Sequence, residues 1–150
     1  MTRSEILALT VDCIDFKNKT VKVEKSLYKG EIIRHRNKYQ VREVHISDEL
    51  CKILKSEIKP ENNLLFPNSD GNVQDPDNMI KRRFNPVIRK AGIKPIRFID
   101  LRDTYAALLI KQNLPLTYVQ EQLGQSSVNV TAERYKNIIP DVKISVLKLI

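Results

Sequence analysis

Residues 96–138, IRFIDLRDTYAALLIKQNLPLTYVQEQLGQSSVNVTAERYKNI, are the stretch that decides the fold. From 100 to 110, apolar residues recur at helical spacing and predict an amphipathic helix. Its apolar positions are Leu101, Tyr105, Leu108 and Leu109. A second apolar run, 116–123, predicts a shorter helix, because it stops at Gly124, a residue type that often closes helices.

A third helix is predicted after two serines. Ser126 and Ser127 are suitable N-caps, because a serine hydroxyl accepts a hydrogen bond from a free backbone N–H of the first helical turn, and the helix they open carries Tyr135. The stretch thus holds a helix with an arginine, a short helix ending in Leu-Gly, two serines and a helix with a tyrosine. This order resembles the C-terminal half of the catalytic domain of tyrosine recombinases, the phage integrase family.

The resemblance rests on short motifs. Family members typically read His-Asp-Leu-Arg-His-Thr, then Leu-Gly-His-Ser-Ser, then a tyrosine, and this chain reads IDLRDT at 99–104, LGQSS at 123–127 and Tyr135. Elsewhere SEILALTVDCIDFKNKTVKVEKSLYKG, REVHISDEL, LLFPNSDGN and RRFNPVIRKAGI resemble the family's sheet, loop and helix segments. The likeness covers nearly the whole chain. It implies one catalytic-type domain, 1–150, without the helices and the N-terminal DNA-binding domain that usually precede it.

The composition is that of a globular protein. The chain has 150 residues, enough for one domain with a core, and 41% of them are apolar and 29% charged. No run is long and apolar enough to cross a membrane, and the N-terminus lacks the layout of a signal peptide. Cys13 and Cys51 have no metal-ligand residues beside them, so we interpret them as reduced thiols of a cytoplasmic protein.

Positive charge is concentrated in two segments. The net charge is +8, which favours a polyanionic partner. The basic residues between 79 and 102 are opposed only by Asp100, and those between 29 and 42 only by Glu31. We therefore predict binding to double-stranded DNA, and association with the nucleoid when DNA is bound. The expected DNA contacts are Arg34, Arg36, Lys38, Lys81, Arg82 and Arg83.

The remaining elements are short. A capping box at 2–5 opens a helix, and a further capped helix begins at Ser47, with Leu50, Leu54 and Ile58 on one face. A helix at 78–91 should be kinked or split by Pro86. Strands are predicted at 20–28, 32–36 and 41–46, and a last helix at 142–150. We predict an α+β fold, mostly helical, with a small three-stranded antiparallel sheet.

The resemblance implies phosphotyrosyl strand exchange. A tyrosine hydroxyl attacks a DNA phosphodiester and forms a covalent phosphotyrosine, which conserves the bond energy for resealing. Two arginines bind the non-bridging oxygens, because a planar guanidinium gives bidentate, charge-assisted hydrogen bonds to the transition state. A lysine protonates the leaving 5′ oxygen, and histidines assist proton movement. No metal or cofactor is implied.

Only part of this catalytic set is present. Tyr135 matches the nucleophile and Arg102 matches the second arginine. The other four positions hold Thr2 (first arginine), Arg36 (lysine), and Ile99 and Gln125 (histidines). Arginine stays protonated near neutral pH and is a poor general acid, whereas a glutamine amide is able to donate a hydrogen bond to phosphate. Tyr135 and Arg102 are therefore the main catalytic candidates, and Arg36 and Gln125 are weaker ones.

These substitutions favour a DNA-binding domain of a phage or mobile-element recombinase in which strand cleavage is weak or absent. Two alternatives stay open. The first is an active integrase in which Arg3, Lys38 and Gln125 act through a shifted geometry. The second is an architectural or regulatory DNA-binding protein on the recombinase scaffold. The 142–150 helix resembles the segment that docks family members on a neighbouring protomer, so a homo-oligomer on DNA is also expected.

Four residues have a plainer structural interpretation as well. Arg102 is a candidate for an ion pair with Asp103 or Glu133. Tyr135 is a candidate for an ordinary packing residue, since a tyrosine on an amphipathic helix is usually half-buried. His35 and His45 fall on predicted strands, where solvent exposure is the expected state.

Overall fold

The computed structural model describes residues 1–138, so the predicted helix at 142–150 lies outside the described residues. Its helices are α1 (Arg3–Leu7), α2 (Asp48–Glu57), α3 (Pro76–Met79), α4 (Asn85–Lys90), α5 (Asp100–Lys111), α6 (Leu116–Leu123) and α7 (Val128–Arg134). Two further helical turns are η1 (Val11–Cys13) and η2 (Ile80–Phe84). The strands are β1 (Ile14–Asp15), β2 (Thr20–Val23), β3 (Lys25–Tyr28), β4 (Glu31–Arg34) and β5 (Arg42–His45).

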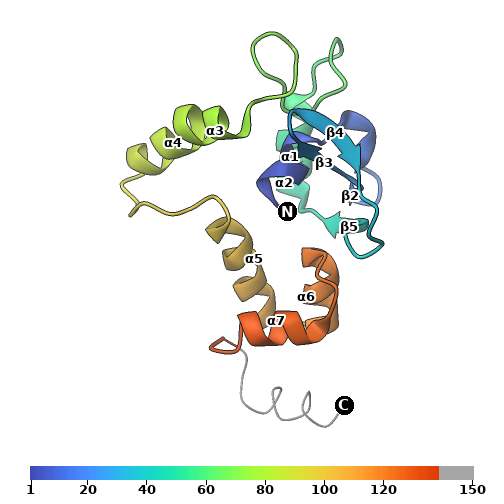
Figure 1. The fold of residues 1–150 in the computed structure, drawn as a ribbon, viewed down its shortest axis with the longest axis vertical. Helices are drawn as coiled ribbons and strands as arrows, with labels where there is room; N and C mark the ends of the chain where they lie inside the picture. The colour runs from blue at the N-terminus through green and yellow to red at the C-terminus, as the bar shows by residue number, and fades with distance from the viewer. Residues whose placement is uncertain (139–150) are drawn as a thin grey trace.

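The elements form three groups (Figure 1). The strands gather with α1 and α2, α3 and α4 extend beside them as an arm, and α5, α6 and α7 form a helical group at the other end of the chain. Helices and a small antiparallel sheet together confirm the predicted α+β class.

The three-stranded sheet has the order β1-β2-β5, and β3 pairs with β4 in a separate hairpin. The register pairs Val21 of β2 with Ile14 on one side and Val44 on the other. The predicted strand at 20–28 is therefore two strands, which divide at Glu24. The chain changes partner there: β3 pairs with β4, and the Glu24 carbonyl accepts a hydrogen bond from the backbone N–H of His35, just after β4.

The β3–β4 hairpin closes through a two-residue loop. Lys29 and Gly30 have φ values of 50° and 86°, and two successive positive φ angles are typical of the turn that matches the twist of a tight hairpin. The turn thereby holds Arg34 at the end of β4, directly before His35 and Arg36.

The core under the sheet is formed by Leu9, Cys13, Ile14, Val21, Leu54 and Leu65. Ser47 caps α2 as predicted, and its hydroxyl accepts a hydrogen bond from the Leu50 N–H. The predicted buried face of α2 is partly wrong, because Leu50 is exposed and Cys51 is buried beside Leu54. Both cysteines are buried free thiols, as the sequence indicates.

The arm is the predicted helix at 78–91, and Pro86 does interrupt it. The π-helical turn η2 separates α3 from α4, and Pro86 occupies the first turn of α4. A proline lacks the N–H that an α-helix needs in its interior, and a wider turn before it removes the clash with the preceding carbonyl. Gly92 ends the arm with φ of 67°.

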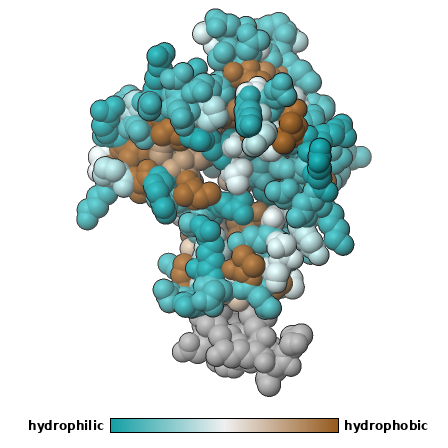
Figure 2. All heavy atoms as spheres, in the orientation of Figure 1, coloured by the Kyte–Doolittle hydropathy of each residue, from teal (hydrophilic) through white to brown (hydrophobic). Residues whose placement is uncertain are grey.

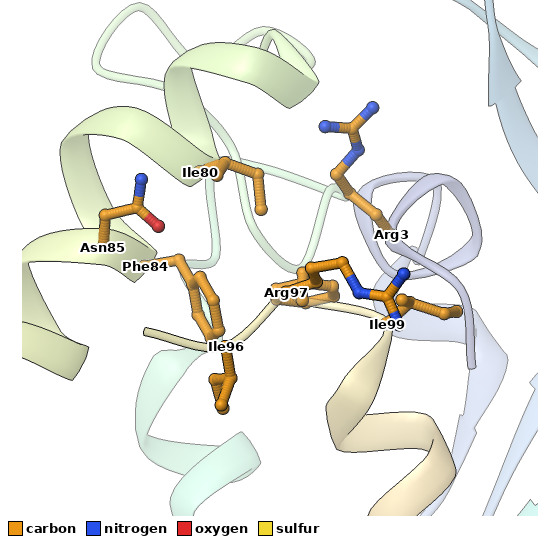
Figure 3. Close-up of a pocket in the computed structure, with 8 residues that line it drawn as sticks. Arg3, Ile80, Phe84, Asn85, Ile96, Arg97 and Ile99 are labelled. Atoms are coloured by element: carbon orange, nitrogen blue, oxygen red, sulfur yellow. The ribbon is translucent and has the colours of Figure 1, made fainter. Parts of the chain in front are cut away.

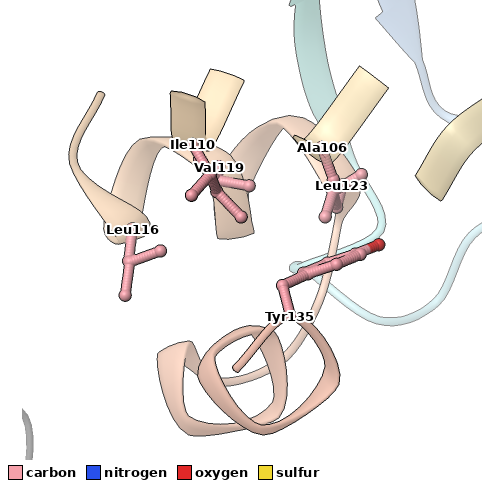
Figure 4. Packing of buried hydrophobic residues seen from close by; sticks show 6 residues of the cluster. All are labelled: Ala106, Ile110, Leu116, Val119, Leu123 and Tyr135. Atoms are coloured by element: carbon pink, nitrogen blue, oxygen red, sulfur yellow. The ribbon is translucent and has the colours of Figure 1, made fainter. Parts of the chain in front are cut away.

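The helical group has its own core, made of Ala106, Ile110, Leu116, Val119, Leu123 and Tyr135 (Figure 4). The predicted apolar face of α5 is partly wrong. Leu101 and Leu108 are 46% and 54% exposed, whereas Ala106 and Ile110 are fully buried. The face of α5 that is buried depends on where α6 and α7 dock, and a small alanine permits a closer approach than a leucine.

Gln122 of α6 connects the helical group to the sheet. Its amide nitrogen donates to the carbonyl of Glu43, and its amide oxygen accepts from the backbone N–H of His45 and from the Tyr105 hydroxyl. Because the Gln122 side chain is buried, these bonds tie α6 to β5 with its polar atoms satisfied.

The surface is mainly hydrophilic, with apolar patches over the arm and smaller ones over the strands and the helical group (Figure 2). Val87 of α4 and Ile93, three residues after α4, are 63% and 52% exposed. No helix in the described part of the chain has the length and apolarity needed to cross a bilayer.

Candidate active site

Tyr135 lies where α7 ends. It is the C-cap residue of that helix, and only 4% of its surface is exposed. Its ring packs in the core of the helical group (Figure 4), and its hydroxyl donates a hydrogen bond of 2.8 Å to Oδ1 of Asp103. The predicted nucleophile is therefore also a core residue in this structure.

Asp103 of α5 is the acceptor for two neighbours. Besides the phenol, it binds Arg134, whose Nε lies 3.1 Å from Oδ1 and whose Nη2 lies 3.0 Å from Oδ2. Burial raises the pKa of Asp103, but the hydrogen bonds from Arg134 and Tyr135 outweigh this effect and leave the pKa below its ordinary value. Asp103 is therefore a carboxylate at neutral pH, held between a cation and a phenol.

The hydrogen bond that lowers the pKa of Asp103 raises the pKa of Tyr135. Burial, the hydrogen bond to Asp103 and the negative charge of Asp103 raise the pKa of the Tyr135 phenol to about 12. Arg134 and Arg102 lower it by smaller amounts. The phenol is thus protonated at neutral pH, and it is a poorer nucleophile than an unperturbed tyrosine.

Arg102 lies one residue before Asp103 and faces the same cluster. Its Nη2 donates a 2.6 Å hydrogen bond to the carbonyl of Leu123, at the end of α6. Burial lowers the pKa of Arg102, and the guanidinium is close enough to Glu5 and Tyr135 for their charges to raise it. The alternative ion pairs are wrong, because Asp103 pairs with Arg134, and Glu133 pairs with Lys136.

A buried ion pair joins α1 to the sheet beside Arg102. Arg42 of β5 donates from Nη1 and Nη2 to the two carboxylate oxygens of Glu5, at 2.9 and 3.0 Å. Its remaining hydrogen bonds go to the carbonyls of Gln122 and Gln40. Both side chains of the pair are about 95% buried. Sequence reasoning gave this pair no role, because nothing in the local pattern links Glu5 to a residue 37 positions away.

Gly124 lies against this pair. Its φ is 68°, and a Cβ added there would be 2.8 Å from Nη1 of Arg42. The Leu-Gly step therefore closes α6 and also leaves room for the guanidinium. The sequence predicts that Gly124 ends the helix with a positive φ, but it does not predict that Arg42 lies against it.

Gln125 follows in the loop between α6 and α7. Its side-chain oxygen accepts a hydrogen bond from Thr131, and its backbone carbonyl accepts one from Gln120. Since the oxygen is engaged by Thr131, the amide nitrogen is the end of Gln125 that remains to meet a phosphate. Gln125 is half-buried and one residue from Gly124.

Arg36 lies apart from these residues, in the exposed segment between β4 and β5. It lines an open cavity of about 600 Å³ together with Ser26, Tyr28, Ile33, Arg34, His35 and Gln40. Its neighbour His35 is not exposed, contrary to prediction. Only 7% of the His35 side chain is accessible, and its Nε2 lies 3.8 Å from Oε1 of Glu5. His45 is exposed as predicted.

Arg3 is directed to the arm. Its Nη1 donates to Oδ1 of Asp77 at 3.0 Å and contacts the carbonyl of Pro76. Arg3 also lines a cleft of about 420 Å³ that includes Ile99 (Figure 3). Thr2, at the first arginine position, caps α1 through a reciprocal capping box with Glu5. Neither residue contacts Tyr135 in the described part of the chain.

Comparison with known proteins identifies the family. The sequence profile of the phage integrase family matches residues 1–140. The chain belongs to the phage integrase family.

Two curated relatives are longer than this integrase-family chain. It is 26% identical to the tyrosine recombinase XerC-like protein of Caldanaerobacter subterraneus subsp. tengcongensis, over 99% of this chain and 45% of that protein. It is 28% identical to the integrase of Salmonella phage P22, over 65% of this chain and 28% of that protein. The chain therefore spans less than half the length of either relative.

Solved structures show the same fold. The integrase of the Tn1549 transposon, solved in complex with circular intermediate DNA, has a TM-score of 0.75 at 18% identity, over 100% of this chain and 56% of that one. The XerA recombinase has a TM-score of 0.69 at 23% identity, over 91% of this chain and 52% of that one. At these identities the likeness concerns the fold alone.

In this integrase-family chain the predicted DNA-contacting residues are exposed. Lys81, Arg82 and Arg83 lie on η2 and make no ion pair within residues 1–138. Lys38 lies over the ring of Tyr39, and Arg34 is 3.7 Å from Glu24. An unpaired arginine or lysine on the surface is free to bind a phosphate.

The structure thus brings some of the predicted site residues together and not others. Arg102 and Tyr135 share one cluster, with Gln125 on the adjoining loop, while Arg36 lies on the hairpin side. Sequence reasoning gave Arg134 no role, and it considered Asp103 only as an ion-pair partner of Arg102. The available signal was an aspartate at the position where the family motif has histidine, directly after Arg102.

Proposed function

We propose that this chain is the DNA-binding domain of a site-specific recombinase of a phage or mobile element, and that its strand-cleaving activity is weak or absent. One observation carries the proposal. Arg102 and Tyr135 lie in one cluster, yet the Tyr135 hydroxyl is buried and bonded to Asp103, while Arg3 is bonded to Asp77. The chain has the fold of the family, but most of the side chains that the family reaction uses are replaced.

The missing groups explain why the activity is expected to be low. Removing one donor to a developing negative charge typically costs a factor of 10²–10³ in rate. Thr2 engages its hydroxyl in a helix cap, and Ile99 has no polar atom on its side chain. Such losses are not additive, but among the six catalytic positions of the family they leave Arg102 and Gln125 near Tyr135 to bind a phosphate.

DNA binding is supported by the charge and by the relatives. The exposed cations of η2 and of the β4–β5 segment stand on two separate elements, which makes contacts to different phosphates of one duplex available. The Tn1549 integrase, which has this fold, was solved in complex with DNA. We extend the proposal to a cytoplasmic protein that associates with the nucleoid when bound to DNA, and to oligomers on DNA formed through residues 142–150.

A second candidate function is an architectural or regulatory DNA-binding protein. The observation that favours it is the burial of Tyr135, which packs like a core residue and is held by a carboxylate. The third candidate is an active integrase in which Arg3, Lys38 and Gln125 act through a shifted geometry. The ion pair of Arg3 with Asp77 argues against it, because that pair holds the Arg3 guanidinium at the arm.

Covalent trapping separates these candidates. The protein is mixed with pooled, nicked duplexes of random sequence, and adducts that survive denaturation are counted beside Tyr135→Phe, with DNA binding measured in the same samples. We expect binding with few or no adducts. Abundant adducts that depend on Tyr135 would refute weak chemistry, and absence of binding would refute the DNA-binding function.

The salt dependence of binding tests the proposed surface. Replacing Lys81, Arg82 and Arg83 together by alanine should reduce the slope of log K against log salt by up to about 3, because each phosphate contact contributes about 0.9. A matched control replaces three exposed lysines elsewhere, Lys17, Lys52 and Lys59, and removes the same charge. Equal changes in slope for both variants would show that only net charge matters.

A further inference from the structure

Three side chains at the junction of α5 and α7 form one closed contact. Asp103 accepts from the Tyr135 hydroxyl at 2.8 Å and from two nitrogens of Arg134 at 3.1 and 3.0 Å. Arg134 also lies over the Tyr135 ring, with its guanidinium carbon 5.9 Å from the ring centroid. Each of the three side chains therefore contacts the other two, so a displacement of one of them breaks two contacts and leaves the third without support.

The charges around this contact are of both signs. On α5, Arg102 and Asp103 face the phenol, and on α7 Arg134 faces it. Asp100, one turn earlier on α5, also acts on Asp103 through its charge, but its own hydrogen bonds go to Arg97. Asp103 is thus the one carboxylate bonded to the phenol in the described part of the chain, and Arg134 is its cation.

The three residues differ in how accessible they are. The side chains of Arg134 and Asp103 are 49% and 30% exposed, whereas Tyr135 is 4% exposed. An incoming anion therefore meets Arg134 before it meets the phenol. Arginine binds phosphate with the same bidentate geometry with which it binds a carboxylate, so a phosphodiester and Asp103 compete for one guanidinium.

We propose that Asp103 is a positioning residue that holds Tyr135 in a closed state, and that a DNA phosphodiester bound at Arg102 opens it by drawing Arg134 away from Asp103. The inference rests on the proposed function, because Tyr135 is the nucleophile position of that reaction. It assigns to Asp103 the control of whether the phenol oxygen lies in the protein core or faces DNA. No covalent bond changes in this step.

The physical basis is the loss of a cation from a shared carboxylate. While Arg134 is bound, the Asp103 carboxylate is fixed at both oxygens and accepts the phenol proton in a defined direction. Once a phosphate binds Arg134, the carboxylate faces a second negative charge, and the two anions repel each other at short range. Rotation of Asp103 away from the phosphate breaks its hydrogen bond to Tyr135.

The closed state is tested in the free protein by NMR of tyrosines labelled at Cζ. The chain has five tyrosines, and Tyr135→Phe identifies the signal of Tyr135. In the wild type this phenol should titrate near the raised pKa of about 12. Asp103→Asn keeps the shape of the side chain and removes its charge, so the pKa of Tyr135 should fall, although burial still holds it above its ordinary value. Acetylation of Tyr135 by N-acetylimidazole should become faster.

Two further variants separate positioning from a merely structural role. Asp103→Glu restores the carboxylate and should raise the pKa of Tyr135 again. Asp100→Asn removes a carboxylate one turn away that does not contact the phenol, and should leave this pKa unchanged. An unchanged pKa of Tyr135 in a folded Asp103→Asn protein would overturn the inference, as would an equal fall in Asp100→Asn.

The opening step is tested by adding a nicked duplex of random sequence at saturation. Binding should lower the pKa of Tyr135 and increase its acetylation in the wild type, and should change neither further in Asp103→Asn. A saturated wild-type complex with an unchanged Tyr135 signal would overturn the opening step. Failure to bind the duplex would overturn the proposed DNA-binding function and the opening step, while the titration of the free protein still decides the role of Asp103.

Discussion

The buried ion pair between Glu5 and Arg42 yields the sharpest prediction about stability. Glu5→Gln keeps the size of the side chain and its place in the capping box, because glutamine also serves there. It removes the negative charge that faces a guanidinium which is 95% buried. It also places an amide donor against one of the two Arg42 donors, so that at most one of the two original hydrogen bonds remains.

The expected magnitude follows from that geometry. Breaking a buried pair by removing one partner costs about 3–5 kcal/mol, since the other charge stays buried without compensation. With a urea dependence of about 2 kcal/mol per molar for a domain of this size, the unfolding midpoint should fall by about 2 M. That loss is a large share of the total stability of about 5–15 kcal/mol typical of such domains.

Urea unfolding at neutral pH, followed by circular dichroism, measures this change. The control is the double variant Glu5→Gln with Arg42→Met, which removes the stranded charge and should be more stable than Glu5→Gln alone. A loss of unfolding free energy below about 1 kcal/mol for Glu5→Gln would refute the reasoning. A loss in the double variant equal to the sum of the losses in Glu5→Gln and in Arg42→Met alone would refute it too.

The pH dependence of the same pair has a definite sign. Burial raises the pKa of Glu5, but the hydrogen bonds and charge of Arg42 outweigh it and leave the pKa below its ordinary value of 4.5. A carboxyl group with a lowered pKa in the folded state stabilises the fold above its unfolded pKa, and this contribution is lost as the pH falls. The difference between wild type and Glu5→Gln should therefore shrink below about pH 4.5.

Two further predictions concern Gly124 and Tyr135. Gly124→Ala should destabilise the protein by about 1–3 kcal/mol more than Gly92→Ala in urea unfolding, because both sites have positive φ but only Gly124 would place its Cβ against Arg42; equal losses would contradict the clash. For Tyr135, the raised pKa of about 12 means that the neutral phenol stabilises the fold below pH 10, and that this contribution is lost between pH 10 and 12. The stability advantage of wild type over Tyr135→Phe should shrink by about 3 kcal/mol across that window, and a constant advantage would contradict the assignment.

The stability experiments and the Tyr135 titration test different parts of the proposed site. A loss of stability at Glu5 or Gly124 concerns the scaffold that places Arg102, whereas a change in the Tyr135 titration concerns the reacting group itself. The two are measured independently, because Asp103 lies on α5 and the Glu5–Arg42 pair lies between α1 and β5. Trapping with DNA then shows whether the cluster performs any strand cleavage.

Much of the local structure was determined by the sequence alone, because the interactions that form it lie within a few residues. The hydroxyl groups of Thr2 and Ser47 cap two helices by accepting hydrogen bonds from N–H groups three residues later, and the Glu5 carboxylate accepts in return from the Thr2 N–H. Pro86 interrupts the arm because it lacks an N–H, and Gly124 closes α6 because it tolerates positive φ. The order of motifs in 96–138 identified the family from residues alone.

Only the tertiary structure decided which side chains meet. Asp103 and Tyr135 are 32 positions apart, and Glu5 and Arg42 are 37 apart, so no local spacing predicts either contact. The burial of His35 and the choice of Ala106 over Leu108 on α5 have the same origin. Helix and strand patterns predict which faces are apolar, but which faces become buried depends on how the elements pack against one another. The chemistry of Tyr135 depends on that docking, because its partner Asp103 comes from another helix.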